Sequence, residues 1–159
     1  MRHLAIFLLC ALLCACSSID CPVQNVVSVQ YVVRNADGTE RSLSDSLSIS
    51  TQRSDGTDTL LLNRLIGQSA FSLPASYSHP EDVLVFTFAN TSGRVVDTVW
   101  IKKEDIPHFE SVDCSAAFFH ELTSVRHTRN AIDSLVLKNS SVTYDVSTIH
   151  FHLYPKSSD

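Results

Sequence analysis

The chain has 159 residues, of which 44% are hydrophobic and 18% charged, and its formal net charge at pH 7 is −5. A chain of this length can form a single domain with a proper hydrophobic core, so a second domain is not needed. A mildly acidic surface repels phosphate backbones and anionic head groups, so we expect no nucleic-acid partner.

The first fifteen residues have the pattern of a secretory signal peptide. A short basic start is followed by residues 4–15, which are uncharged and mostly apolar. A membrane-spanning helix needs about 20 apolar residues, and this stretch stops before the polar Ser17. We predict that residues 1–15 are removed. The remaining 144 residues carry 11 Lys and Arg against 17 Asp and Glu, a net charge of −6.

The signal peptide leads into Leu13-Cys14-Ala15-Cys16, which resembles the lipobox of bacterial lipoproteins. In that motif an aliphatic residue and two small residues precede the cysteine whose thiol accepts a diacylglycerol. Cys10 and Cys14 each follow a bulky leucine, so Cys16 is the predicted lipidation site. The resemblance implies three acyl chains, and anchoring becomes stable once two or more are present. The alternative is a plain secretory signal cut near the same place.

Two cysteines remain once Cys16 carries lipid. In an oxidising compartment Cys21 and Cys114 are expected to form a structural disulfide. Neither lies in the CxxC spacing that is common in metal and redox sites. Residues 16–24 then form a lipidated tether, and residues 25–155 form the folded domain.

The folded part consists of short runs of β-branched and aromatic residues separated by turn residues, which is typical of sandwiches and barrels. The predicted strands are 26–34, 43–51, 59–63, 71–73, 83–89, 95–102, 116–125, 135–137 and 149–154. Leu47 and Ile49 alternate with serines and are expected to share one face. Residues 83–88 are apolar on both faces, which predicts a central strand. Residues 116–125 also suit a helix by composition.

The predicted fold class is therefore all-β, as a single antiparallel β-sandwich, Ig-like or barrel-like, of about eight or nine strands. The pattern contains no internal repeat and no flexible interdomain linker.

Four motifs follow one another between residues 97 and 154: DTVWI, ESVDCSAAFFHEL, TRNAIDSLVLKNSSV and IHFHLY. Together with Cys16 and Cys21, they resemble a family of small, uncharacterised Bacteroidota lipoproteins, grouped as domain of unknown function 6452. Members of that family commonly have a glycine after the second cysteine, where this chain has Ser115. The resemblance implies an envelope lipoprotein with no established activity.

Among the seven histidines, His150 and His152 are the best metal candidates, because residues two apart on a strand point to the same side. Their apolar neighbours are expected to face the core, which leaves both histidines outward, where His120 or His127 could supply a third ligand. Two histidines alone are a weak signal. Two solvated histidines on an outer face are the simpler interpretation, so we predict no metal and no cofactor.

The sequence has no signature of nucleophilic or phosphate chemistry. No serine lies in a Gly-x-Ser-x-Gly elbow, and the four glycines leave no phosphate-binding loop. The acid pairs Glu81-Asp82 and Glu104-Asp105 lie beside turns, where solvation is the simplest interpretation. We predict that the protein is not an enzyme.

Four triplets read aspartate, hydroxyl residue, apolar residue, where ordinary residue frequencies predict about one. The triplet resembles the O-glycosylation signal of Bacteroidota envelope proteins. The candidate hydroxyls are Ser46, Thr59, Thr98 and Ser134. The alternative is that a turn aspartate in front of an alternating strand produces the same order.

These observations predict a non-catalytic lipoprotein of the outer membrane, on either its periplasmic or its surface face. It would act as a binding or assembly accessory with an envelope protein partner, and it would contact the membrane through Cys16. The alternative is a carrier or sensor that holds a metal or an apolar molecule at one end of the sandwich or inside a barrel.

Overall fold

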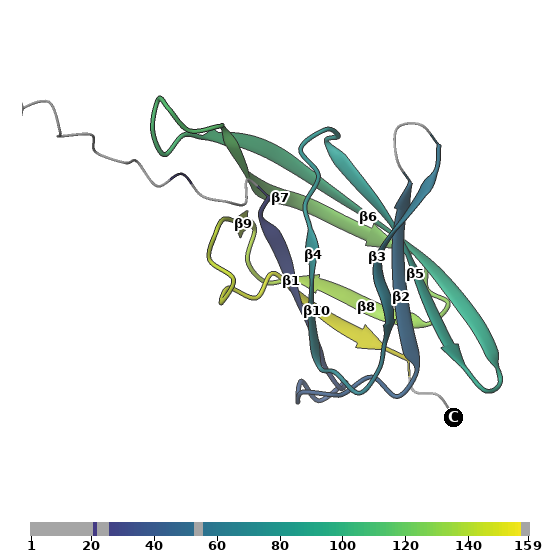
Figure 1. The fold of residues 1–159 in the computed structure, drawn as a ribbon. Helices are drawn as coiled ribbons and strands as arrows, with labels where there is room; N and C mark the ends of the chain where they lie inside the picture. Colours follow the sequence, from purple (N-terminus) through teal and green to yellow (C-terminus); the bar gives the residue numbers. More distant parts are fainter. Residues whose placement is uncertain (1–20, 22–25, 53–55, 157–159) are drawn as a thin grey trace, which may run out of the picture.

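The computed structural model describes residues 21, 26–52 and 56–156. These residues form ten β-strands and no helix, arranged in two sheets (Figure 1). Consequently, no described segment is a helix long and apolar enough to span a membrane. The predicted all-β sandwich is confirmed, with one more strand than the upper end of the expected range. The predicted signal peptide and Cys16 lie outside the described residues.

The smaller sheet has the strand order β4-β1-β10-β8. Its strands are β4 (Ala70–Pro74), β1 (Ser28–Val33), β10 (Phe151–Pro155) and β8 (Ile132–Leu137). β1 and β10 run parallel, whereas the other neighbours are antiparallel. The prediction of a purely antiparallel sandwich is therefore wrong at this pair. β1 and β10 are the first and last strands of the chain and are not joined by a hairpin turn. A hairpin would force an antiparallel pair, so these two strands can pair in parallel.

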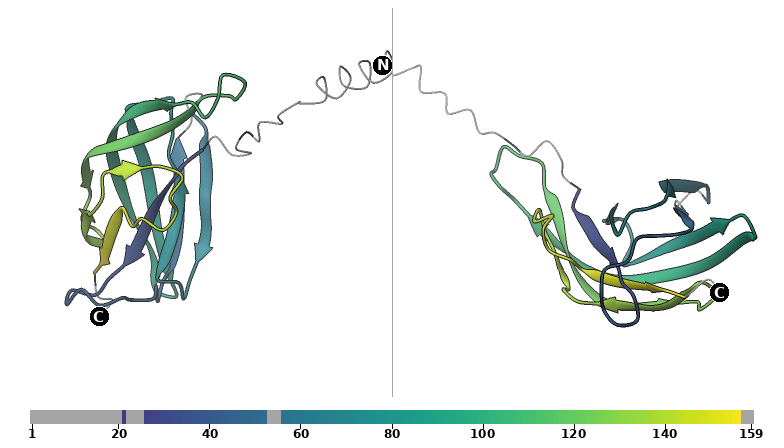
Figure 2. Two further views of the ribbon diagram at one scale, coloured as in Figure 1. Left: turned by 90° about the vertical axis from the view of Figure 1, so that its left-hand side faces the viewer. Right: turned by 90° about the horizontal axis from the view of Figure 1, so that it is seen from below.

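The larger sheet has the strand order β3-β2-β5-β6-β7-β9 and curls strongly (Figure 2). Its strands are β3 (Asp58–Leu65), β2 (Ser46–Gln52), β5 (Glu81–Asn90), β6 (Gly93–His108), β7 (Ala117–His127) and β9 (Ser141–Val142). The apolar β5 lies inside this sheet, as its sequence predicts. β9 was not predicted, because a strand of two residues is too short to show the two-residue alternation of apolar and polar side chains.

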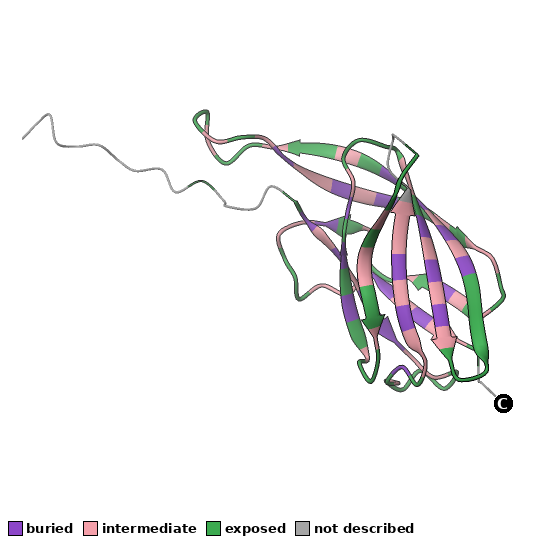
Figure 3. Ribbon diagram, turned by 45° about the vertical axis from the view of Figure 1, so that its right-hand side comes forward, coloured by how far each residue is buried: buried purple, intermediate pink, exposed green. Residues whose placement is uncertain are grey.

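Aromatic rings fill the space between the sheets. Tyr31 stacks on Phe71 at 4.8 Å and on Phe151 at 5.2 Å, all three from the smaller sheet. Phe86 of the larger sheet meets Tyr31 edge-on at 6.4 Å. Such offset and edge-to-face contacts are the favoured geometries of aromatic pairs. Figure 3 shows buried residues alternating with more exposed ones along the larger sheet, which is the period of a half-buried strand.

The predicted inward face of β2 is confirmed. Leu47 and Ile49 are both fully buried, while the serines between and beside them are half-buried. The predicted strands 116–125 and 135–137 are also confirmed: β7 begins one residue later and ends two residues later than predicted, and β8 begins three residues earlier. Residues 116–125 therefore form no helix.

β6 is the longest strand, with 16 residues, and its two neighbours are staggered along it. Residues 93–102 pair with β5, and residues 99–108 pair with β7. The strand continues past the predicted end at Lys102 and through Pro107. Pro107 is tolerated because β5 no longer flanks this part of β6, so no ladder bond on that side requires its N–H. At a rise of about 3.3 Å per residue, β6 spans about 50 Å.

Beyond β5, the end of β6 and the start of β7 project as a two-stranded hairpin. We call residues 104–119 the arm, and its connecting loop, residues 109–116, the tip. In Figure 1 the tip lies on the side of the molecule opposite the C-terminal end of β10, and the views in Figure 2 agree.

Candidate functional site

A groove opens at the end of the molecule opposite the arm, with a cavity of about 240 Å³. The residues that line it come from four separate segments: Arg41, Leu43, Ser44, Asp45, Phe88, Asn90, Val95, Asn130, Ala131, Pro155 and Lys156. An adjoining cavity of about 240 Å³ shares five of these residues and extends to Arg94. We call the combined hollow the end groove.

The end groove is the inner face of the larger sheet where the smaller sheet no longer covers it. Phe88 and Val95 are cross-strand partners, so their side chains point to the same face. Further along that face Asp97 and Val99 are fully buried, whereas Val95 is 44% exposed. The floor of the groove is therefore apolar and open to solvent.

The rim of the end groove carries more positive than negative charge. Arg41, Arg94 and Lys156 contribute cations, and Asp45 contributes a carboxylate. The Arg41 guanidinium donates to the Pro155 carbonyl at 3.4 Å, which holds it across the C-terminal end of β10. An apolar floor with a few polar groups at the rim is the usual composition of a small-ligand site, and this rim favours an anionic group.

Asp97 fixes one wall of the groove. Its carboxylate is fully buried and accepts hydrogen bonds from the Thr128 hydroxyl at 2.5 Å and the Asn130 N–H at 2.8 Å. The N–H groups of Ala131 and Ile132 donate to its second oxygen at 2.7 and 2.8 Å. Burial acts to raise the pKa of Asp97, but these hydrogen bonds together bring that pKa below its ordinary value. The carboxylate therefore stays ionised and holds the chain before β8 against β6.

This role of Asp97 was not visible in the sequence. The sequence shows it only as the first residue of an Asp-Thr-Val triplet, and three of its four partners are backbone N–H groups. Backbone donors carry no residue identity, so no sequence motif could have indicated this site.

A second buried polar cluster lies at the base of the arm. Lys103 has no exposed side-chain surface, and its ammonium group lies 3.1 Å from Asp82 and 2.5 Å from the His79 carbonyl. Burial raises the pKa of Asp82, and the Lys103 charge opposes that shift. Asp105 pairs with the buried His120 at 2.7 Å. The interpretation of Asp82 and Asp105 as solvated acids is therefore wrong, because Asp82 is paired with the buried Lys103 and Asp105 is hydrogen-bonded to the buried His120.

His150 is fully buried, so its predicted outward position is wrong. It precedes β10, which begins at Phe151, so the alternation of that strand does not extend to it. Its Nδ1 accepts the Gln30 N–H at 2.9 Å, and its Nε2 donates to the Ser141 carbonyl at 3.1 Å. Burial lowers the pKa of His150, which keeps the ring neutral.

The histidines do not come together as a metal site. His152 is half-buried on β10, and burial also lowers its pKa. His120 is held by Asp105, and His127 contacts the Thr128 carbonyl at 2.6 Å. Within residues 21, 26–52 and 56–156, no group of three or more His, Cys, Asp or Glu residues is arranged to hold a metal ion.

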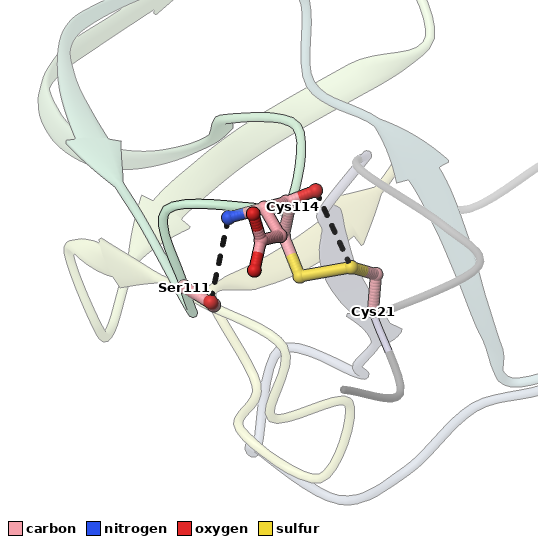
Figure 4. Close-up of a disulfide and its surroundings, with 4 residues drawn as sticks. Cys21, Ser111 and Cys114 are labelled. Carbon is pink, nitrogen blue, oxygen red and sulfur yellow. Dashed lines mark hydrogen bonds between the residues drawn. A yellow bond between two sulfur atoms is a disulfide. The ribbon is translucent and has the colours of Figure 1, made fainter. Parts of the chain in front are cut away.

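The structure joins Cys21 to Cys114 through a disulfide with a Cα–Cα distance of 5.5 Å, which fits the predicted pairing. Cys114 lies in the tip, where its N–H donates to the Ser111 carbonyl at 3.2 Å (Figure 4). The bridge therefore ties the chain just before β1 to the end of the arm.

The four candidate glycosylation hydroxyls are dispersed over both sheets. Ser46, Thr59 and Thr98 lie on β2, β3 and β6 of the larger sheet, and Ser134 lies on β8 of the smaller sheet. All four are half-buried, and the Ser46 hydroxyl donates to the Ala89 carbonyl at 3.0 Å. They form no common site, and their glycosylation stays a prediction.

Comparison with known sequences gives a single family. The sequence model of the "Family of unknown function (DUF6452)" matches residues 46–155, which is 110 of the 159 residues. The match includes the arm and the groove residues between Phe88 and Pro155, whereas the groove residues Arg41, Leu43, Ser44, Asp45 and Lys156 lie outside it. No curated protein and no solved structure matches the chain.

Proposed function

The chain belongs to the DUF6452 family of unknown function, and from this premise we propose that it is a lipid-anchored, non-catalytic binding protein of the bacterial cell envelope. In this proposal Cys16 carries the lipid at the outer membrane of a Bacteroidota cell. The end groove binds an envelope partner at a distance from the bilayer.

The observation that carries the proposal is the separation of the disulfide and the groove along β6. Cys21 follows Cys16 by five residues, and five extended residues reach about 17 Å. Cys21 is bonded to the tip, beyond one end of β6, whereas the groove surrounds the other end. Because β6 spans about 50 Å, a lipid on Cys16 would keep the tip near the bilayer and hold the groove outward.

The composition of the groove supports binding rather than catalysis. The described residues that line it include no His, Cys or Glu, and its single carboxylate comes from Asp45. Ser44 and Ser92 supply hydroxyls without a histidine base beside them in that lining. General-base activation of a nucleophile would need such a pair within hydrogen-bond reach.

The test of the anchor is metabolic labelling with an alkyne fatty acid in the native host. The wild-type protein is expected to take up the label, and Cys16→Ala is expected to remain unlabelled and uncut. Cys21→Ser is the matched control, because it removes a nearby thiol that the proposal does not acylate. Label on Cys16→Ala would refute the anchor.

A stoichiometric protein partner that copurifies in mild detergent would support the binding role.

A small-ligand carrier is the second candidate, and the positive rim over the apolar floor of the end groove favours it. The probe 8-anilinonaphthalene-1-sulfonate combines an apolar ring system with an anionic group. Val95→Asp should weaken its binding about tenfold or more, because the charge would enter the floor. Val96→Asp is the matched control, since Val96 is similarly exposed, at 41%, but points to the opposite face. Equal affinity in both variants would exclude the groove as the probe site.

A further inference from the structure

We infer that the tip of the arm inserts into the lipid interface, so that the protein contacts the bilayer with its own side chains as well as with its lipid. The inference rests on the proposed lipid anchor and extends it. The residues that would enter the interface are Phe109 and Val112.

These side chains are unusually exposed for large apolar groups. Val112 is 98% exposed and Phe109 is 66% exposed. They fall within four consecutive residues at the end of one hairpin. Single exposed apolar residues are normal on soluble proteins, but a group at a protruding end indicates a surface that meets an apolar phase.

The arm is braced, so its tip is presented in a defined position. His108 stacks on Phe119 at 4.2 Å, and Tyr144 from the segment after β9 meets Phe119 edge-on at 5.0 Å. On the other face of the arm, Phe118 stacks on Tyr77 at 5.4 Å. A two-stranded hairpin without such support is marginally stable in water. The exposed residues at the tip contribute nothing to these contacts, which leaves them available for lipid.

The disulfide brings this apolar tip to the anchor. Val112 lies two residues from Cys114, and Cys114 is bonded to Cys21. With lipid on Cys16, five extended residues limit the distance from the bilayer surface to Cys21 to about 17 Å. Among the described elements, the tip is the one covalently held within that reach, and this is the reason for choosing lipid as its occupant.

The charges of the tip exclude electrostatic attraction as the driving force. Glu110 and Asp113 flank Val112, and the Glu110 carboxylate lies 2.9 Å from the His108 ring. Two carboxylates would be repelled by anionic lipids, so insertion must depend on apolar burial. We therefore choose neutral phosphatidylcholine vesicles for the test.

The experiment reconstitutes the full lipidated protein, with the background substitution Trp100→Phe, in vesicles of brominated phosphatidylcholine. Val112→Trp should lose about half of its emission to the bromine atoms, because interfacial segments lie roughly 5–10 Å into the headgroup and acyl boundary. Ile66→Trp is the matched control. Ile66 is also an exposed aliphatic residue, at 58%, but it lies between the end of β3 and the start of β4, away from the tip. The emission of a tryptophan at position 66 should therefore be unaffected.

The outcomes separate this inference from the proposed function. Quenching at position 112 but not at 66 supports both. A protein that carries lipid and floats with vesicles, but shows no quenching at position 112, overturns the inference alone and leaves the proposed lipid anchor standing. A protein without lipid mass that does not float overturns both.

Discussion

The two ends of β6 are each flanked by one strand, yet they are stabilised by different interactions. At the groove end, the chain from Thr128 to Ile132 takes the place of the missing strand and bonds to Asp97 and to the Thr98 backbone. At the arm end, no described segment takes the place of β5 along residues 104–108. That end is held by stacked rings, by the Asp105–His120 hydrogen bond at its base and by the disulfide.

The difference follows from where each end lies. A buried sheet edge must satisfy its polar groups, so the groove end uses hydrogen bonds from neighbouring backbone. The arm projects from the sheets and buries little surface, so it needs contacts that do not depend on a core. We expect the groove end to lose stability when its polar partners are removed, and the arm to lose stability when the cross-link is removed.

The largest effect is expected from removal of the cross-link. Cys21→Ser/Cys114→Ser should lower the free energy of unfolding by about 4 to 5 kcal/mol, because the bridge closes a loop of 93 residues in the unfolded chain. Urea unfolding measures this change. Wild-type protein reduced with dithiothreitol is the control and should match the variant. Unchanged stability in both would show that ring stacking alone holds the arm.

At the groove end, Asp97→Asn should cost about 3 kcal/mol, because the amide NH₂ would face buried N–H donors that then lack an acceptor. Asp133→Asn is the matched control, since Asp133 begins another of the Asp-hydroxyl-apolar triplets but is exposed. Its change should stay within about 0.5 kcal/mol. Urea unfolding distinguishes them. Equal effects would mean that the Asp97 hydrogen bonds contribute no net stability.

Within the arm, Phe119→Ala should cost about 2 kcal/mol, because it removes a partly buried ring that contacts His108 and Tyr144. Phe109→Ala should leave stability unchanged, because Phe109 is 66% exposed. Thermal unfolding of the two variants tests this division of the arm into a bracing part and a free tip. A large loss in Phe109→Ala would contradict the assignment of that residue to the tip.

The smallest effect is a pH dependence at a third point, where His150 connects β1 to β9. Burial lowers the pKa of His150 below its unfolded value of about 6.5, with smaller opposing effects of the hydrogen bond to the Ser141 carbonyl and of Asp145. The unfolded state then binds more protons, so this stability is fully present above pH 6.5 and declines as the pH falls below it. The melting temperature should fall from pH 7 to pH 5.5, and less so in His150→Asn. Equal slopes would contradict the prediction.

Much of the fold could be predicted because strand signals are local. The alternation around Leu47 and Ile49 has a period of two residues, which defines an inward face without any knowledge of the neighbouring strands. The apolar run of β5 likewise predicts a central position. The pairing of Cys21 with Cys114 followed from counting thiols after Cys16 was assigned to lipid.

The chain by itself therefore determined the all-β class, most of the strands and the candidate disulfide. Only the tertiary structure decided the parallel β1–β10 pair, the burial of His150, the Asp97 site and the end groove. Each of these depends on segments far apart in sequence; Asp97, for example, meets donors 31 to 35 residues further along the chain. Such contacts depend on which strands pair and on where one sheet stops covering the other, and the pattern within a single strand does not identify its partner strand.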